Sequence, residues 1–270
     1  MRGVVKFIVA ILIAAVSLVT YWCNTQENEF TGEQQHVDMT VEQEIALGLQ
    51  AAPQMAEQYG GLHPDRQAAA QLKEIGQKLV QSTKASETPY QFDFHLLADE
   101  QTVNAFALPG GQIFITAGLL KQLESEAQVA GVLGHEIGHV VARHSAEQLA
   151  KAKLTQGLTG AAAIATYDPE NPASRTGAVA AAMIGKLLNM SYGREDELES
   201  DRLAVRLTGE AGYDPRAMIR VMEILEQASG GAARGPEFMQ THPNPGNRIA
   251  QIQSAIQEEY PEGLPSGLVQ

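Results

Sequence analysis

The chain has 270 residues, of which 44% are hydrophobic and 19% charged, a composition that permits one sizeable globular domain with an ordinary core. Its formal charge of −13, with no run rich in Lys and Arg, argues against a nucleic-acid partner. A single cysteine, Cys23, excludes an internal disulfide framework and a cysteine-based zinc site. Any zinc site must therefore be built from histidine and carboxylate side chains.

The amino terminus has the pattern of an export signal. Arg2 and Lys6 are followed by an apolar run over 7–22, which together with the residues before it approaches the ~20 residues needed to span a bilayer. We interpret residues 1–24 as a signal sequence or membrane anchor, and favour an uncleaved anchor over acylation of Cys23 and over a cleaved signal. The basic residues would stay cytoplasmic, which puts the rest of the chain on the periplasmic or extracellular side.

The next segment, 25–38, is polar and lacks periodicity, and this is typical of a tether to a folded domain, here expected over 39–260. Two packing helices should open that domain, the first with Thr40 as its N-cap and Gln43 at the capping-box position. Residues 261–270 are expected to form a flexible tail.

A strand is predicted at 91–97, where aromatic and polar residues alternate. His95 within it has no partner at helical spacing and is interpreted as structural. A Pro-Gly-Gly turn and a β-prone run follow within 104–116. This run is either an ordinary hairpin strand or a sheet edge that pairs with an extended peptide. The residues of the hypothetical edge are Asn104, Gly110, Gly111, Gln112 and Ile113.

Two histidines four residues apart, His135 and His139, lie in a run that reads as helix. Positions i and i+4 share one face of a helix, so both imidazoles can bind one metal ion while Glu136 stands beside the open position. The chemistry needs these residue types, because neutral imidazole suits zinc and a carboxylate must take the proton of an attacking water. Glycines at 131, 134 and 138 indicate that something approaches the helix backbone closely. A chance HExxH in a surface helix is the alternative.

The same helix is expected to continue over 125–151. In a continuous helix His144 would be rotated off the metal-facing stripe, so it is predicted to be a polar surface residue. The Ala/Gly-rich stretch 154–188 is expected to form a packed helical hairpin or a lid, with a membrane-dipping hairpin as a minority alternative.

An acidic segment that follows, ELESD, is patterned like a helix. The stripe through Glu195 and Glu199 is charged throughout and should face water, whereas Glu197 and Asp201 point toward protein. Buried carboxylates need a partner or a metal, so Glu197 is the natural third ligand and Asp201 can accept a hydrogen bond from a ligand histidine. A solvated acidic face remains the alternative. Farther on, His242 precedes a proline and is either a turn residue or an active-site group.

Four motifs, NAFALPGGQIFITAGLL, LGHEIGHVVARHS, ELESD and THPNPGNRI, occur in this order between about Asn104 and Ile249. With them the chain resembles peptidase family M48, the zinc metallopeptidases that include HtpX-like, Oma-like and CaaX prenyl protease-like enzymes. The resemblance implies an α+β, predominantly α, gluzincin-type fold with a small sheet beside the HExxH helix. It also implies one zinc ion per chain bound by His135, His139 and Glu197, with Glu136 as general base.

The resemblance extends to three further residues. Asp201 would contact a ligand histidine, and His242 with Arg248 matches an HPxxxxR element that lines the cleft in relatives, where the histidine assists catalysis or plugs the zinc. The chain departs from some relatives in lacking several membrane spans and a helical-repeat extension.

The function expected from these features is a zinc-dependent metalloendopeptidase that hydrolyses polypeptide substrates in envelope protein quality control. A non-catalytic chaperone or scaffold that retains zinc for stability is the alternative from another class. The presence of Glu136 argues against it, because structural zinc needs no general base.

Overall fold

The computed structural model describes residues 2–166, 191–229, 236–243 and 246–270. The chain divides into two compact units. The first consists of Met1–Thr40 and Ser145–Asn189, and the second of Val41–His144 and Met190–Gln270. The described residues 145–166 therefore belong to the unit that contains the amino-terminal segment.

The first unit contains α1 (Arg2–Cys23), β1 (Thr25–Glu27), β2 (Gln34–His36) and most of α6 (His144–Thr166). The second contains α2 (Val41–Gln58), α3 (Arg66–Gln81), a short 3-10 helix (Lys84–Glu87), β3 (Asp93–Leu97), β4 (Ala105–Ala107), β5 (Gln112–Thr116), α4 (Ala117–Leu120), α5 (Glu126–Val141), α8 (Arg194–Glu210), α9 (Ala217–Ser229), α10 (Glu237–Thr241) and α11 (Arg248–Glu259).

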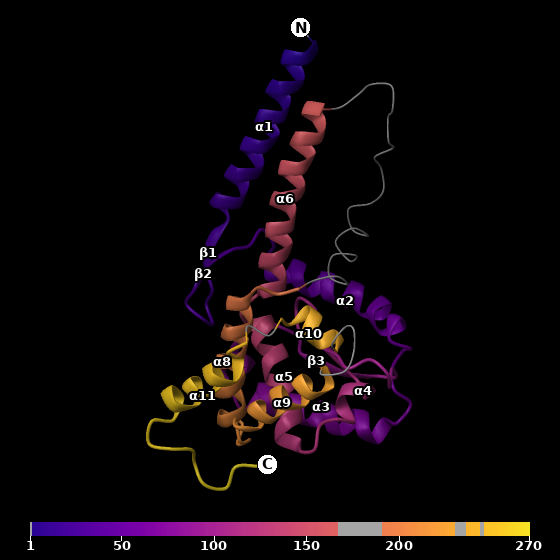
Figure 1. The fold of residues 1–270 in the computed structure, drawn as a ribbon, viewed down its shortest axis with the longest axis vertical. Helices are drawn as coiled ribbons and strands as arrows, with labels where there is room; N and C mark the ends of the chain where they lie inside the picture. Colours follow the sequence, from indigo (N-terminus) through magenta and orange to yellow (C-terminus); the bar gives the residue numbers. More distant parts are fainter. Residues whose placement is uncertain (1, 167–190, 230–235, 244–245) are drawn as a thin grey trace. The chain divides into compact units, whose positions relative to one another are not determined.

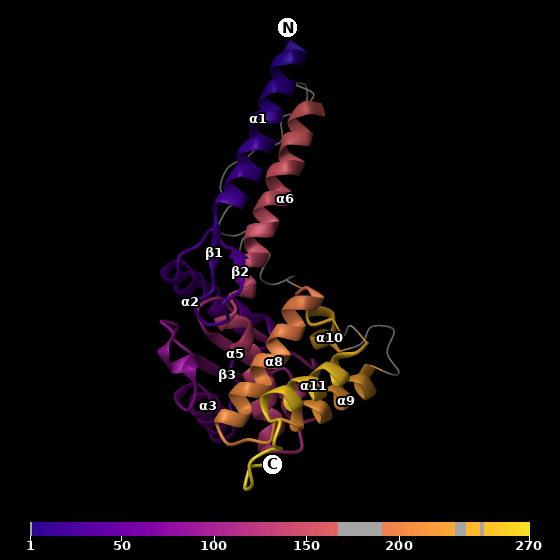
Figure 2. The same cartoon turned by 90° about the vertical axis from the view of Figure 1, so that its left-hand side faces the viewer.

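Helix α1 has the length and composition of a membrane span. Its apolar stretch Val4–Cys23 has 20 residues and a mean hydropathy of 2.4, and only 6% of its most apolar window is buried within the protein. Apolar side chains such as Phe7 and Trp22 are largely exposed, which a membrane or a membrane-targeting machinery would relieve. Helix α6 lies beside α1 in both views (Figures 1 and 2). It accounts for the first part of the predicted hairpin over 154–188, and the rest of that prediction lies outside the described residues.

The segment 25–38, expected to be an irregular tether, contains a short antiparallel hairpin in which Gln26 pairs with Gln35. The side-chain oxygen of Asn28 accepts hydrogen bonds from the backbone of Phe30 (2.8 Å) and Thr31 (3.0 Å), and this forms the turn. Three-residue strands are too short to show a period of two, so the sequence pattern could not predict them.

The second unit is built around a three-stranded sheet with the order β3-β5-β4. Strand β5 pairs in parallel with β3 and antiparallel with β4, and all five of its residues are buried. The prediction that Gln112 and Ile113 belong to a sheet edge is therefore wrong, because both sides of β5 already carry a partner strand. The edges of this sheet are β3 and β4.

Gly110 and Gly111 form the turn that precedes β5, with φ of +83° and +107°. A Cβ atom on Gly110 would lie 2.4 Å from Cα of Ile45, so both the backbone conformation and the contact with α2 require glycine. His95 on β3 is structural, as predicted: it hydrogen-bonds Gln112 at 2.9 Å and stacks on Phe114.

Helices cover this sheet and bury α5 in the middle of the unit (Figures 1 and 2). Helix α5 packs against α8, α9 and α3, and it also contacts β4 and β5, so the sheet lies beside the HExxH helix. The prediction of an α+β, predominantly α fold is confirmed. In the tail predicted over 261–270, the backbone of Val269 hydrogen-bonds to Gly212 and Asp214, both at 2.9 Å.

Candidate metal centre

Helix α5 presents the HExxH residues inside the second unit. Ser125 caps its first turn through Gln128, and both histidines and Glu136 are buried. Two glycines of α5 lie where this helix contacts α8, and their lack of a side chain allows the two helices to approach. A Cβ atom on Gly138 would lie 3.2 Å from the backbone of Ser200, and one on Gly134 would lie 3.3 Å from Thr208. The close approach indicated by these glycines is present, and it places α8 against the metal-facing region of α5.

Four side chains converge next to this contact: His135 and His139 from α5, Glu197 from α8, and His242 at the end of α10. One ligand atom from each lies within 4.8 Å of the others, and all four side chains are buried. The Nε2 atoms of His135 and His139 are 3.0 Å apart, and each lies 3.5–3.6 Å from a Glu197 oxygen. Nδ1 of His242 lies 3.0 Å from Oε1 of Glu197.

These spacings fit a zinc ion. Ligand atoms about 2.0–2.1 Å from a tetrahedral ion are separated from one another by roughly 3.3 Å, close to the spacings observed here. Burial lowers the pKa of His135, but hydrogen bonds to Asp201 and Glu197 outweigh it and raise that pKa to about 9. The carboxylates of Asp201 and Glu197 thus place negative charge around His135, whereas burial holds the pKa of His139 well below its ordinary value and favours the neutral imidazole that can bind a metal.

A second set of contacts holds His135 in place. Its Nδ1 lies 3.0 Å from Oδ1 of Asp201, and Arg248 donates two hydrogen bonds to the same carboxylate at 2.7 and 2.6 Å. Arg248 is itself buried and its Nη1 lies 3.0 Å from Oε2 of Glu197. The carboxylate of Asp201 therefore orients the imidazole so that Nε2 faces the candidate ion, as in other histidine metal sites.

Glu136 is fully buried beside the four converging side chains. Neither of its carboxylate oxygens has a hydrogen-bond partner among the described residues, and Nε2 of His242 lies 3.7 Å from Oε1. Burial raises the pKa of Glu136, while His242 and His135 counteract that rise. A buried carboxylate without partners is costly unless it receives a proton or a bound water, so its surroundings suit a group that exchanges protons.

His144 is buried rather than at the surface, which makes the prediction for it wrong. Helix α5 ends at Val141 and Arg143 adopts φ of +58°, so the expected continuous helix over 125–151 is broken. The Nδ1 atom of His144 then lies 2.8 Å from Nδ1 of His139. Neither Gly, Pro nor Asn marks the break, and the only hint in the sequence is a third histidine close to HExxH.

The five residues predicted to form a substrate-binding sheet edge do not lie on one edge strand in the structure. Asn104 directly precedes the edge strand β4, and its side chain is buried and bonded to Glu237 (3.0 Å) and Tyr59 (3.2 Å). Gly110 and Gly111 form a turn, and Gln112 with Ile113 lies on the central strand. Of the five residues, only Asn104 adjoins a sheet edge.

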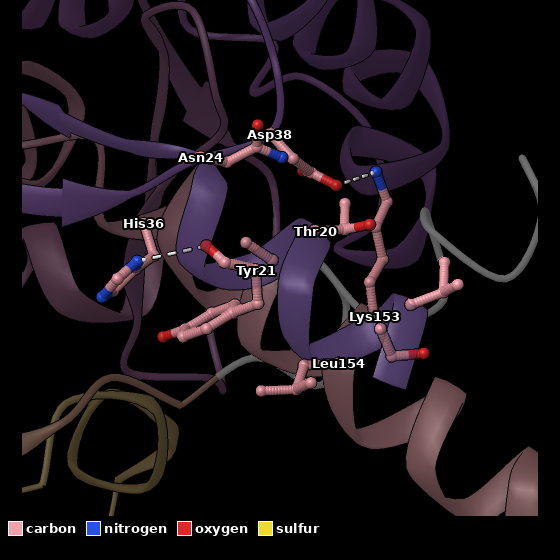
Figure 3. Close-up of a pocket in the computed structure, with 10 residues that line it drawn as sticks. Thr20, Tyr21, Asn24, His36, Asp38, Lys153 and Leu154 are labelled. Carbon is pink, nitrogen blue, oxygen red and sulfur yellow. Dashed lines mark hydrogen bonds and ion pairs between the residues drawn. The ribbon is translucent and has the colours of Figure 1, made fainter. Parts of the chain in front are cut away.

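A pocket of about 200 Å³ lies within the first unit, between the end of α1, β2 and α6 (Figure 3). Its charged side chains satisfy each other, because Nζ of Lys153 donates to Asp38 at 2.7 Å. His36 in the same pocket contacts the carbonyl of Tyr21 at 3.3 Å. The four converging side chains beside α5 and α8 include two histidines at metal-ligand spacing, which this pocket lacks, so they are the stronger candidate for chemistry.

Two histidines and a carboxylate arranged for one ion, with a buried glutamate beside them, define a metallopeptidase-type centre. The model of peptidase family M48 matches residues 66–256. The chain belongs to this family.

Named relatives agree with the family. The chain is 31% identical over 196 residues to the beta-barrel assembly-enhancing protease of Escherichia coli (strain K12), covering 70% of this chain and 39% of that protein. It is 30% identical over 229 residues to the protein of the same name from Yersinia pestis, covering 83% and 46%. It is 36% identical over 165 residues to the mitochondrial metalloendopeptidase OMA1 of Arabidopsis thaliana, covering 61% and 32%. The chain spans less than half the length of these three relatives.

Proposed function

We propose that the protein is a zinc-dependent metalloendopeptidase. The observation that carries the proposal is the convergence of His135, His139 and Glu197, with the unpartnered carboxylate of Glu136 buried beside them. His135 and His139 would bind through Nε2 and Glu197 through a carboxylate oxygen. Membership of family M48 supports the same activity.

A zinc ion at this site would polarise the substrate carbonyl and lower the pKa of an attacking water. Glu136 accepts the proton of that water as it attacks the carbonyl carbon, and later donates the proton to the leaving amine. The low solvent access around Glu136 strengthens its interaction with the developing charges. Asp201 and Arg248 keep His135 oriented throughout, without contacting the substrate.

His242 has two candidate roles, and we favour donation of a hydrogen bond to the developing oxyanion over capping of the zinc in a resting state. Phe238 stacks on the imidazole with ring centroids 4.4 Å apart, which limits its rotation. Nδ1 of His242 is close to both Glu197 (3.0 Å) and Nε2 of His135 (3.4 Å), which places the imidazole next to the proposed zinc site, as either role requires.

We expect His242→Ala to lower turnover by on the order of 10²–10³-fold, the loss typical of one oxyanion donor. Peptide hydrolysis at saturating zinc measures this effect, with His63→Ala as a control because His63 lies outside the cluster. An increase in basal activity would instead favour the capping role. A rate within about twofold of the parent would exclude both roles.

The substrate is proposed to be a polypeptide that adds a strand to β4, in place of the edge predicted at Gln112. Strand β4 contacts α5, whereas the other edge strand, β3, packs against α3. Asn104 and Leu108 exchange backbone hydrogen bonds with β5, at 3.0 and 2.8 Å, so by alternation Ala105 and Ala107 direct their backbone groups to the opposite side. Ala105 and Ala107 are buried in this structure, so an extended peptide could pair with these groups only after the segments that cover β4 have moved away.

The setting we propose is the cell envelope, with α1 as an uncleaved anchor and the second unit on the periplasmic or extracellular side. The apolar, exposed surface of α1 supports attachment, and the basic residues Arg2 and Lys6 support its orientation. Acylation of Cys23, which is free and exposed, is the second alternative. Envelope protein quality control is suggested by the relatives named as assembly-enhancing proteases.

The proposal is tested with the chain prepared with and without residues 1–24. We expect about one zinc per chain, because three protein ligands from one chain complete the site. Casein hydrolysis should be lost with a chelator and restored by zinc. Zinc binding without any hydrolysis would favour the scaffold alternative, and absence of zinc after gentle purification would contradict the metal site itself.

A further inference from the structure

The break between α5 and α6 is held by a buried ion pair. Arg143 occupies the left-handed region at φ +58°, a conformation that non-glycine residues adopt only when the surrounding structure imposes it. Its Nε donates to Glu44 on α2 at 2.9 Å, and Glu44 is only 2% exposed. This contact holds the backbone at the break between the two helices, and the next residue, His144, then lies with its imidazole against His139 of α5.

The imidazole of His144 connects the candidate metal cluster to a carboxylate on α8. Nδ1 of His144 lies 2.8 Å from Nδ1 of His139, and Nε2 of His144 lies 3.0 Å from Oε2 of Glu199. One proton assignment satisfies both contacts when His139 uses Nε2 for a metal: Nδ1–H of His139 donates to His144, and Nε2–H of His144 donates to Glu199.

The two ligand histidines on α5 are therefore supported in different ways. The carboxylate of Asp201 contacts the imidazole of His135 directly. The carboxylate of Glu199 reaches His139 only through the imidazole of His144, which lies between them. The side chain of His144 is 1% exposed and that of Glu199 is 16% exposed, so this chain of contacts leads from the buried cluster to the surface. Glu199 was expected to face water, but its side chain is only partly exposed and its carboxylate contacts the buried His144.

We propose that His144 is a positioning residue that holds the metal-binding tautomer and ring orientation of His139, and that Glu199 acts on His139 only through His144. Hydrogen-bond partners of ligand histidines typically contribute 10–100-fold to metal affinity. This inference rests on the proposed zinc site but not on peptidase activity, because its consequence is a change in zinc affinity.

The test measures zinc affinity of the full-length protein by competition with a chelator. We expect His144→Ala to weaken zinc binding by roughly 10–100-fold, and Glu199→Ala to weaken it less. The double variant should bind zinc no more weakly than His144→Ala alone, because Glu199 has no separate path to His139. His144→Gln should recover part of the loss, since its amide can accept from His139 and donate to Glu199.

Glu195→Ala is the matched control, because Glu195 lies one turn from Glu199 on the same helix and is exposed. Unchanged affinity in both His144→Ala and Glu199→Ala would overturn the proposal, as would losses that add in the double variant. If His144→Ala does not fold, the comparison of Glu199→Ala with Glu195→Ala decides: equal affinities overturn the proposal and a loss confined to Glu199→Ala supports it. A parent protein without zinc would overturn the proposed function as well.

Discussion

Replacing Glu136 with Gln should abolish peptide hydrolysis while zinc remains bound. The substitution preserves the size of a fully buried side chain, so the packing around α5 can persist. It removes the group that accepts the proton of the attacking water, and loss of general-base catalysis costs on the order of 10²–10⁴-fold. The proposed ligands His135, His139 and Glu197 are all retained, which separates the loss of chemistry from the loss of metal.

The measurement pairs casein hydrolysis with metal analysis on the same preparation. Glu195→Gln is the control, because it makes the same chemical change on an exposed position of α8. Hydrolysis by Glu136→Gln at the parental rate would remove this residue from the mechanism. Loss of zinc together with activity would show that Glu136 contributes to the metal site, contrary to the proposal.

Removing the carboxylate of Glu197 should release the zinc outright, whereas neutralising Asp201 should weaken binding by roughly 10–100-fold. Glu197 supplies an oxygen to the cluster, so Glu197→Ala leaves only the two histidines on α5 and His242. Asp201→Asn keeps an oxygen near His135, but it removes the charge that Arg248 neutralises. The two variants should therefore differ clearly in zinc affinity.

Chelator competition on the two variants and on Glu195→Ala measures this difference. Glu195 is preferred to Glu199 as the control, because Glu199 contacts His144 and through it the proposed ligand His139. Equal zinc affinities of Glu197→Ala and the parent would remove Glu197 from the ligand set. A release of zinc by Glu195→Ala would contradict the prediction, made from the helical period, that Glu195 faces solvent and Glu197 faces the metal site.

Much of this molecule follows from local sequence patterns. The spacing of His135 and His139 defines a shared helix face, and the helical period of ELESD separates Glu197 and Asp201 from the exposed Glu195. Both patterns lie within one element, where a period of 3.6 residues decides which side chains are neighbours. The glycines on α5 likewise indicated a close neighbour, and α8 occupies that position. The apolar amino terminus is recognisable from composition alone.

Tertiary structure decided the features that depend on pairing between distant segments. Strand β5 is central because it pairs with both β3 and β4. The sequence pattern within residues 112–116 does not indicate which strands will pair with it. The break at Arg143 depends on Glu44, 99 positions earlier, and without that ion pair the helix period predicts the wrong side for His144. A single residue in the left-handed conformation changes the direction of the chain after it. Contacts between distant segments, rather than the local helix period, therefore determined that His144 lies next to His139.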